Sequence, residues 1–121
     1  MKSHTRRAVA LISATIINKQ TYSLIQNIEN YEFHKLSCNI LPTMIDAYDD
    51  EMKCFIKGNI KEDKISIYHF GNANYIDLKI NNNHFEGFDY DSVTDFTGDL
   101  NDDQISLNDH EYQKVFEYLV K

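Results

Sequence analysis

Residues 45–120 repeat one 20-residue pattern four times, and this repeat constrains the fold more than any other feature of the chain. The copies occupy residues 45–60, 65–80, 85–100 and 105–120, align without gaps and are joined by four-residue links. Their first position is Ile or Phe, their last is Ile, Leu or Val, and their fifth is Asp in three copies and His in the second. A unit of this length is too short for a strand, a helix and two loops, but it accommodates one β-hairpin.

Apolar and polar residues alternate within each copy, which is typical of strands with one buried face. In the third copy Phe85, Gly87 and Phe96 point one way, and Glu86 and Phe88 point the other. Polar turns separate the two strands of each copy, so the repeat predicts an antiparallel meander of about eight strands. The inward set includes Ile56, Ile60, Ile65, Ile67, Ile76, Leu78, Ile80, Phe96, Leu100, Ile105, Leu107, Phe116 and Val120.

Such a sheet leaves its apolar face uncovered, and the N-terminal segment is the candidate for covering it. Residues 8–17 are the most apolar stretch, and Val9, Ile12 and Ile16 share one helical face, although their β-branched side chains also suit a strand. We expect a helix here. The predicted fold class is therefore α+β, a meander of hairpin repeats covered by an N-terminal helical segment. The alternative is an all-β barrel, in which the sheet closes on itself.

Three other segments carry local signals. Residues 23–26 fit a capping box and predict a short helix, while residues 31–41 match only the second half of the repeat and predict one strand before Pro42. Residues 108–111 also look like a helix start, followed by apolar residues at helical spacing. The register of the repeat predicts a strand over residues 109–120 instead, and we favour the strand because three earlier copies have the same pattern.

The chain length indicates one domain over residues 1–121, with residues 1–44 as the cover and first strand and residues 45–120 as the four hairpins. The chain has 12 basic and 19 acidic residues and a formal net charge of −7. This balance argues against nucleic acid and against an anionic membrane surface as partners, and it favours a basic protein.

The cysteines and the N-terminus indicate the compartment. The register places Cys38 at an inward strand position and Cys54 at the start of a strand, so we expect two separate free thiols in a reducing cytoplasm. A basic start followed by an apolar run resembles the first regions of a signal peptide. The run is short, however, and Asn18, Lys19 and Gln20 follow it in place of a small-residue cleavage site. We expect a cytoplasmic protein.

A search for chemistry finds no catalytic, cofactor-binding or metal-binding pattern. Residues 99–103 have the oxygen spacing that opens a calcium loop, but Gln104 and His110 replace the required Gly and Glu. The five histidines lack zinc-ligand spacing, and we expect His69, at the fifth position of its repeat, to be a solvated turn residue. We therefore expect no cofactor, no metal and no enzymatic activity.

The meander places all the turns within hairpins at one end of the sheet, and this end is acidic. Seven acidic residues gather there against Lys53 alone. This charge either keeps the protein soluble or steers a basic partner to the surface, with Tyr48 and Tyr90 as aromatic anchors. The candidate partner-binding acids are Asp49, Asp50, Glu51, Asp89, Asp91, Asp109 and Glu111.

The strings at residues 87–91 (Gly-Phe-Asp-Tyr-Asp) and 96–100 (Phe-Thr-Gly-Asp-Leu), with the small size and the acidic charge, resemble bacterial immunity proteins. Bacteria use these proteins against polymorphic and contact-dependent toxins. The resemblance covers residues 45–120 only. It implies a cytoplasmic protein that binds one cognate basic toxin domain, often a nuclease, and blocks its active site. The alternative function is a carrier that encloses a small hydrophobic ligand in a closed barrel.

Overall fold

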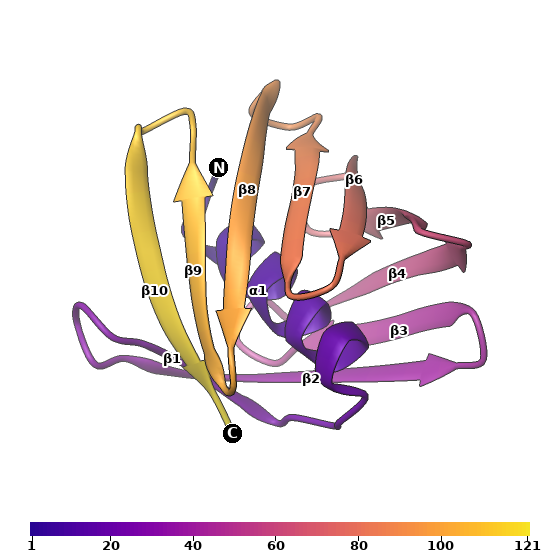
Figure 1. Cartoon of the computed structure of the whole chain (residues 1–121), viewed down its shortest axis with the longest axis horizontal. Coiled ribbons are helices and arrows are strands. Elements are labelled where there is room, and N and C mark those ends of the chain that lie inside the picture. The colour runs from indigo at the N-terminus through magenta and orange to yellow at the C-terminus, as the bar shows by residue number, and fades with distance from the viewer.

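Ten strands form one closed antiparallel barrel in the computed structural model, which describes residues 1–121 (Figure 1). Consecutive strands pair along the whole chain from β2 to β10, and β1 closes the barrel by pairing with both β2 and β10. The predicted meander is confirmed, because β3 to β10 are the eight strands expected from the repeat, and the barrel alternative describes its closure with β1 and β2. The elements are α1 (Ser3–Asn18), β1 (Leu24–Asn27), β2 (Phe33–Leu41), β3 (Met44–Asp49), β4 (Cys54–Lys61), β5 (Lys64–His69), β6 (Asn74–Asn81), β7 (His84–Asp89), β8 (Thr94–Asn101), β9 (Gln104–Asp109) and β10 (Lys114–Val120).

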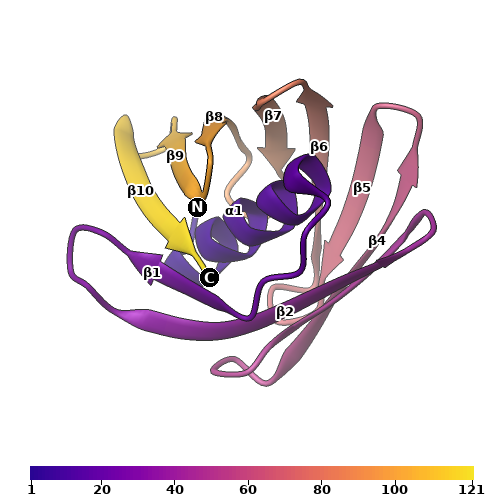
Figure 2. The same cartoon turned by 60° about the horizontal axis from the view of Figure 1, so that its bottom comes forward.

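The helix α1 lies inside the barrel, where Figure 2 shows strands around it. Every residue from Thr5 to Thr15 is buried, so the helix has no solvent-facing side. Small side chains, including Ala8, Ala10 and Ala14, let the surrounding strands approach the helix closely. A helix that is buried on all sides lacks a polar face, which fits its sequence. The predicted N-terminal helix is confirmed, but it fills a barrel rather than covering the open face of a sheet.

The inward-facing residues of the repeat form the rest of the core. Ile76 and Phe96 are 1% and 0% exposed, as their repeat positions predict. Ile60, Ile80 and Phe116 are partly buried and pack at the edge of the same cluster. Each fully buried aliphatic or aromatic side chain contributes about 1.5–3 kcal/mol through the hydrophobic effect, so this cluster supplies most of the driving force for folding.

Two phenylalanines fill the space above two glycines on the neighbouring strand. Phe85 is directly opposite Gly98, and Phe96 is directly opposite Gly87. A Cβ atom on Gly98 would lie 2.0 Å from Cζ of Phe85, and one on Gly87 would lie 2.5 Å from Cζ of Phe96. The ring centroids are 6.5 Å apart, and both rings are fully buried. These two positions need glycine because the rings, and at Gly87 also the carbonyl oxygen of Asp77 at 2.1 Å, occupy the space that a side chain would take.

The two ends of the barrel have different turns. Each turn within a hairpin has four residues and ends on one with positive φ, as Lys53 does with φ 53°. The links between hairpins are tighter than their four-residue spacing suggests. Lys61 pairs with Lys64, which leaves a two-residue turn whose first residue, Glu62, has φ 62°. All the turns within hairpins lie at one end, near the start of α1 (Figure 1).

Of the remaining expectations about secondary structure and cysteines, one is wrong and several are confirmed. Residues 23–26 do not form a helix, because β1 (Leu24–Asn27) supplies the strand that closes the barrel. The strand expected over residues 31–41 is β2, and the C-terminal segment forms β10 rather than a helix. Cys38 is buried on β2, Cys54 begins β4, and both thiols are free.

Candidate functional site

The fifth position of each repeat ends its first strand and faces the barrel interior. Asp49 Oδ1 accepts hydrogen bonds from the amides of Glu51 and Met52 at 3.1 and 3.0 Å, which fixes the turn that follows. Asp89 Oδ2 accepts one from the hydroxyl of Ser92 at 2.8 Å. The four equivalent residues, all fully buried, are called the buried polar ring: Asp49, His69, Asp89 and Asp109.

Two arginines from the first turns of α1 neutralise part of this ring. Arg7 donates from Nε to Asp49 Oδ2 at 3.0 Å and from a terminal nitrogen to Asp49 Oδ1 at 3.1 Å, a bidentate pair. Arg6 donates to Asp109 Oδ2 at 3.0 Å, and its Cζ lies 3.8 Å from the ring centroid of Phe116. The start of a helix also carries partial positive charge, so this end of the barrel favours carboxylates in its interior.

The position of the ring corrects one part of the predicted binding surface. Asp49, Asp89 and Asp109 were expected on the acidic outer edge, but each has 0% exposure. They cannot touch a partner in this structure, because they hold their own turns and, for Asp49 and Asp109, the arginines of α1. The physical reason is that ion pairs and hydrogen bonds offset the desolvation cost of burying a carboxylate.

His69 is likewise a buried residue and not a solvated turn histidine. Its Nδ1 accepts a hydrogen bond from the backbone amide of Asn72 at 3.3 Å, while Nε2 is buried without a hydrogen-bond partner. Burial and the neighbouring His4 lower the pKa of His69 to about 4, although Asp49 and Asp89 act in the opposite direction. His69 is therefore neutral near pH 7, and it replaces a carboxylate in the ring without adding charge.

Some of the predicted partner-binding residues do lie outside. Asp50 and Glu111 are exposed, Asp91 is partly exposed, and the side chain of Glu51 is 60% exposed. Glu51 contacts the ring of His34, and this hydrogen bond lowers the pKa of the Glu51 carboxyl. The outer acidic edge is thus smaller than the sequence suggests, but it persists around the hairpin turns.

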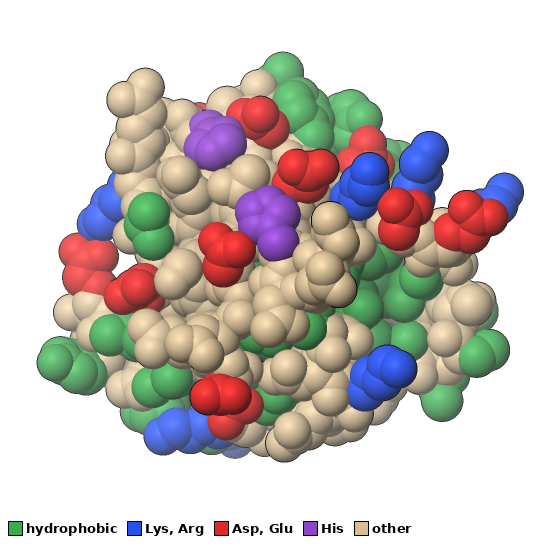
Figure 3. Space-filling model, viewed as in Figure 1, with side chains coloured by type: hydrophobic (Ala, Val, Ile, Leu, Met, Phe, Trp, Pro, Cys, Tyr) green, Lys and Arg blue, Asp and Glu red, His purple; other side chains and the backbone are tan.

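Beside this edge, aromatic side chains cover the outer wall of the barrel from β3 to the turn after β7. They stack edge to face in pairs, with centroids 5.0 Å apart for Tyr48 and Phe55 and 4.8 Å apart for Tyr68 and Tyr75. Figure 3 shows hydrophobic side chains gathered next to Asp and Glu at this end of the barrel. The members, called the aromatic band, are Tyr48, Phe55, Tyr68, Phe70, Tyr75, Phe88 and Tyr90.

Sequence reasoning identified Tyr48 and Tyr90 but missed the band as a whole. Its members occupy the fourth, sixth and eleventh positions of the first three copies, all of which point outward. Phe70 and Tyr75 are 53% and 54% exposed, which is unusual for large aromatic side chains. The signal was present in the alternation, since aromatic residues on the polar side of several neighbouring strands have no core to fill.

Comparison with protein-family models, with curated proteins and with solved structures finds no significant match for this chain. The structure contains no group of three or more His, Cys, Asp and Glu side chains arranged to hold a metal ion. Its one helix, α1, is too short and not apolar enough to cross a membrane. The geometry of the outer wall therefore carries the functional argument.

Proposed function

We propose that this protein is a non-enzymatic binding protein whose partner docks on the aromatic band. The main supporting observation is that Phe55 and Tyr75, on β4 and β6, and Phe70 and Tyr90, in the turns after β5 and β7, are 47%, 54%, 53% and 46% exposed. Monomeric proteins seldom expose contiguous apolar surface of this kind without an interaction to cover it. Aromatic side chains also supply large contact areas at low entropic cost, which makes them frequent anchors of protein interfaces.

The partner is a basic protein surface. Three carboxylates and two arginines are buried, so most of the net charge of −7 remains on the outside. Asp50 and Asp91 lie beside the band at the hairpin turns, and Asp77 accepts a hydrogen bond from the hydroxyl of Tyr90 at 2.8 Å. Acids around an aromatic patch attract basic partners over long range and speed association, and they disfavour nucleic acid and anionic membranes.

More specifically, we propose that the partner is a cognate toxin domain, with a basic nuclease as the leading candidate, and that binding in the cytoplasm blocks its active site. This proposal combines the resemblance of residues 45–120 to immunity proteins with the acidic, aromatic outer wall. The alternative, a carrier with a hydrophobic ligand inside the barrel, would need interior space that α1 occupies. The binding protein is therefore the better-supported function.

The test starts from the genes next to the one that encodes this chain. A toxin domain encoded there should kill cells when expressed alone and should be tolerated when this protein is co-expressed. A toxin domain that kills equally in both conditions, or neighbouring genes without any toxin domain, would contradict the specific proposal.

The docking surface is tested with the same pair by measuring binding with purified proteins. Phe70→Ala with Tyr75→Ala should weaken binding at least about tenfold, which corresponds to about 1.4 kcal/mol. Tyr31→Ala is the matched control, because Tyr31 is 73% exposed and lies outside the band. Equal affinities of the two variants would place the interface elsewhere on the molecule.

A further inference from the structure

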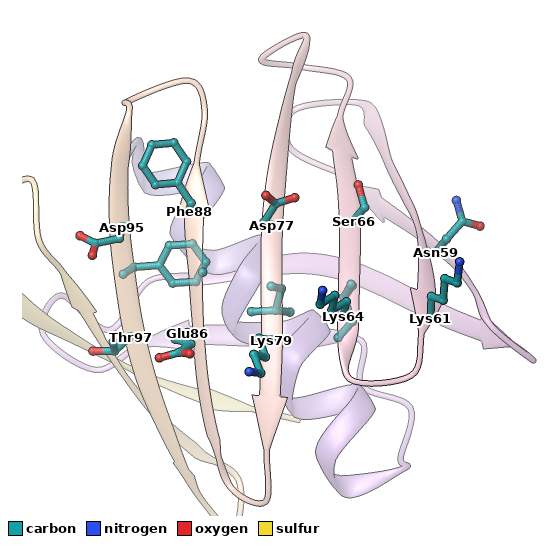
Figure 4. Close-up of a pocket in the computed structure, with 14 residues that line it drawn as sticks. Asn59, Lys61, Lys64, Ser66, Asp77, Lys79, Glu86, Phe88, Asp95 and Thr97 are labelled. Atoms are coloured by element: carbon teal, nitrogen blue, oxygen red, sulfur yellow. The ribbon is translucent and has the colours of Figure 1, made fainter.

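A groove of about 790 Å³ runs over the outside of β4 to β8, beside the aromatic band. Its volume falls in the range of about 300–1,000 Å³ that is typical of small-molecule sites. Figure 4 shows its outward side chains in two rows: Lys61, Lys64 and Lys79 lie in one row, with Glu86 beside Lys79, and Asp77 and Phe88 lie in the other. The groove is thus bordered by charged groups of both signs, and their placement decides what it can hold.

The basic row brings three ammonium groups together from three adjacent strands. Lys61 is directly opposite Lys64, which is directly opposite Lys79. Like charges in directly opposite positions destabilise a sheet. The only carboxylate within 4.0 Å of these groups is Asp63, which lies 3.9 Å from Lys79. Two of the three ammonium groups, those of Lys61 and Lys64, therefore have no carboxylate within 4.0 Å, although Glu62 and Asp63 form the turn between them.

The acids of the groove do not neutralise this row. Asp77 accepts a hydrogen bond from Tyr90 at 2.8 Å, and Asp95 lies 2.8 Å from Nδ1 of His110. Glu86 is opposite Lys79 in the register, yet its carboxylate is not within 4.0 Å of the ammonium group. An anionic group entering the groove is consequently attracted to the end at β4–β6 and repelled from the end at β7 and β8.

The remainder of the groove is apolar. Gly87 has no side chain, and Ile65, Leu78 and Phe96, whose side chains are buried, lie beneath the surface around it. Phe88 stands next to Gly87 and is only partly buried. This surface can cover a flat apolar body that extends from the basic row.

We propose that the groove binds an organic anion that places one acidic group, a carboxylate, sulfonate or phosphate, over Lys61, Lys64 and Lys79. The apolar or aromatic body of the ligand lies against Gly87 and Phe88. Binding relieves the repulsion among the three ammonium groups, because the anion supplies the countercharge that the protein lacks. This site shares Phe88 with the aromatic band, but its basic row lies outside the proposed partner surface, and the inference does not depend on the proposed function.

The probe is anilinonaphthalene sulfonate, which combines a permanent negative charge with an aromatic body and fluoresces when its rings leave water. It should bind the wild-type protein at one saturable site. Lys64→Gln with Lys79→Gln should weaken its binding at least about tenfold, while the control Lys35→Gln, an exposed lysine on β2, should change it less than about twofold. Inorganic phosphate should compete weakly, because it carries the charge without the apolar body.

Two further variants make the result decisive. Phe70→Ala changes the aromatic band outside the groove and should leave dye binding unaltered; a tenfold loss there would show that the dye binds the band and would overturn the proposal. Lys64→Gln without ligand should raise the melting temperature at low ionic strength, because it removes two like-charge contacts. Dye binding that is unsaturable, or unaffected by the lysine substitutions, would also overturn it.

Discussion

Replacing Arg7 with Met tests whether the buried polar ring holds α1 inside the barrel. Arg7 and Asp49 form two hydrogen bonds of 3.0 and 3.1 Å, and their side chains are 6% and 0% exposed. Met preserves much of the volume of the arginine stem but leaves the Asp49 carboxylate buried without its cation. Removing one partner of a buried ion pair costs about 3–5 kcal/mol. This is a large fraction of the roughly 5–15 kcal/mol by which such domains are stable.

The assay is urea unfolding followed by circular dichroism, with Lys2→Met as the matched control. Lys2 pairs with Asp91 at 3.2 Å, but its side chain is 56% exposed. Exposed pairs contribute about 0–1 kcal/mol, so the control should lose less than about 1 kcal/mol. Replacement by Met thus removes a buried cation in one variant and an exposed cation in the other. The difference between the two losses in free energy of unfolding measures the effect of burial.

A double variant identifies the source of the loss. Asn at position 49 keeps an oxygen that can accept the hydrogen bonds from Glu51 and Met52, but it removes the charge. Arg7→Met with Asp49→Asn should therefore be more stable than Arg7→Met alone, because no unpaired charge remains in the interior. The reasoning is refuted if Arg7→Met costs no more than Lys2→Met, or if the two substitutions at positions 7 and 49 are simply additive.

Four further predictions concern the core and the buried titratable groups. The pKa of His69 is lowered from 6.5 to about 4, so the free energy of unfolding should be constant above pH 6.5 and fall by up to about 3 kcal/mol as the pH approaches 4. His69→Gln should reduce this pH dependence between 4 and 6.5, measured by urea unfolding at a series of pH values. Gly98→Ala should cost about 1–3 kcal/mol because its Cβ meets the ring of Phe85, and adding Phe85→Leu should recover part of the loss, whereas an unchanged midpoint would contradict the packing argument. Burial raises the pKa of the Cys38 thiol to about 11, so mass spectrometry should find it unalkylated by iodoacetamide at pH 8 until urea unfolds the chain. Ile76→Ala should cost roughly 2–5 kcal/mol, and a loss below about 1 kcal/mol would show that the residue is not a core residue.

The strands and their inward faces could be predicted because they depend on the alternation of apolar and polar residues, which occurs in all four copies of the repeat. Period two assigns each residue to a face, and the ungapped spacing keeps the same register in every hairpin. The alternation alone was enough to predict that Ile76 and Phe96 are buried. The closure of the sheet was harder to predict, since the strand that closes it, β1, lies outside the repeat and carries a capping pattern typical of helices.

The buried polar ring could not be predicted from its own residues. Asp in a hairpin turn is normally exposed, and the cations that make burial possible lie on a different element, 42 residues before Asp49 and 103 before Asp109. One signal was available. Arg6 and Arg7 directly precede an apolar stretch without a polar face, and such a helix is buried on all sides, so its adjoining charges also enter the interior.

The aromatic band differs from the core in that the fold does not require it. At the fourth, sixth and eleventh repeat positions, the last copy carries Asn108, His110 and Val115, and it forms the same hairpin in the same register. The aromatic residues at these positions in the first three copies are therefore not needed for pairing or for the core, and Phe70 and Tyr75 stay half-exposed. Since α1 fills the interior and Arg6 and Arg7 balance most of the ring's charge within it, the outer wall is the surface on which we propose recognition. Aromatic side chains on that wall that the fold does not require support the proposal of a partner that covers them.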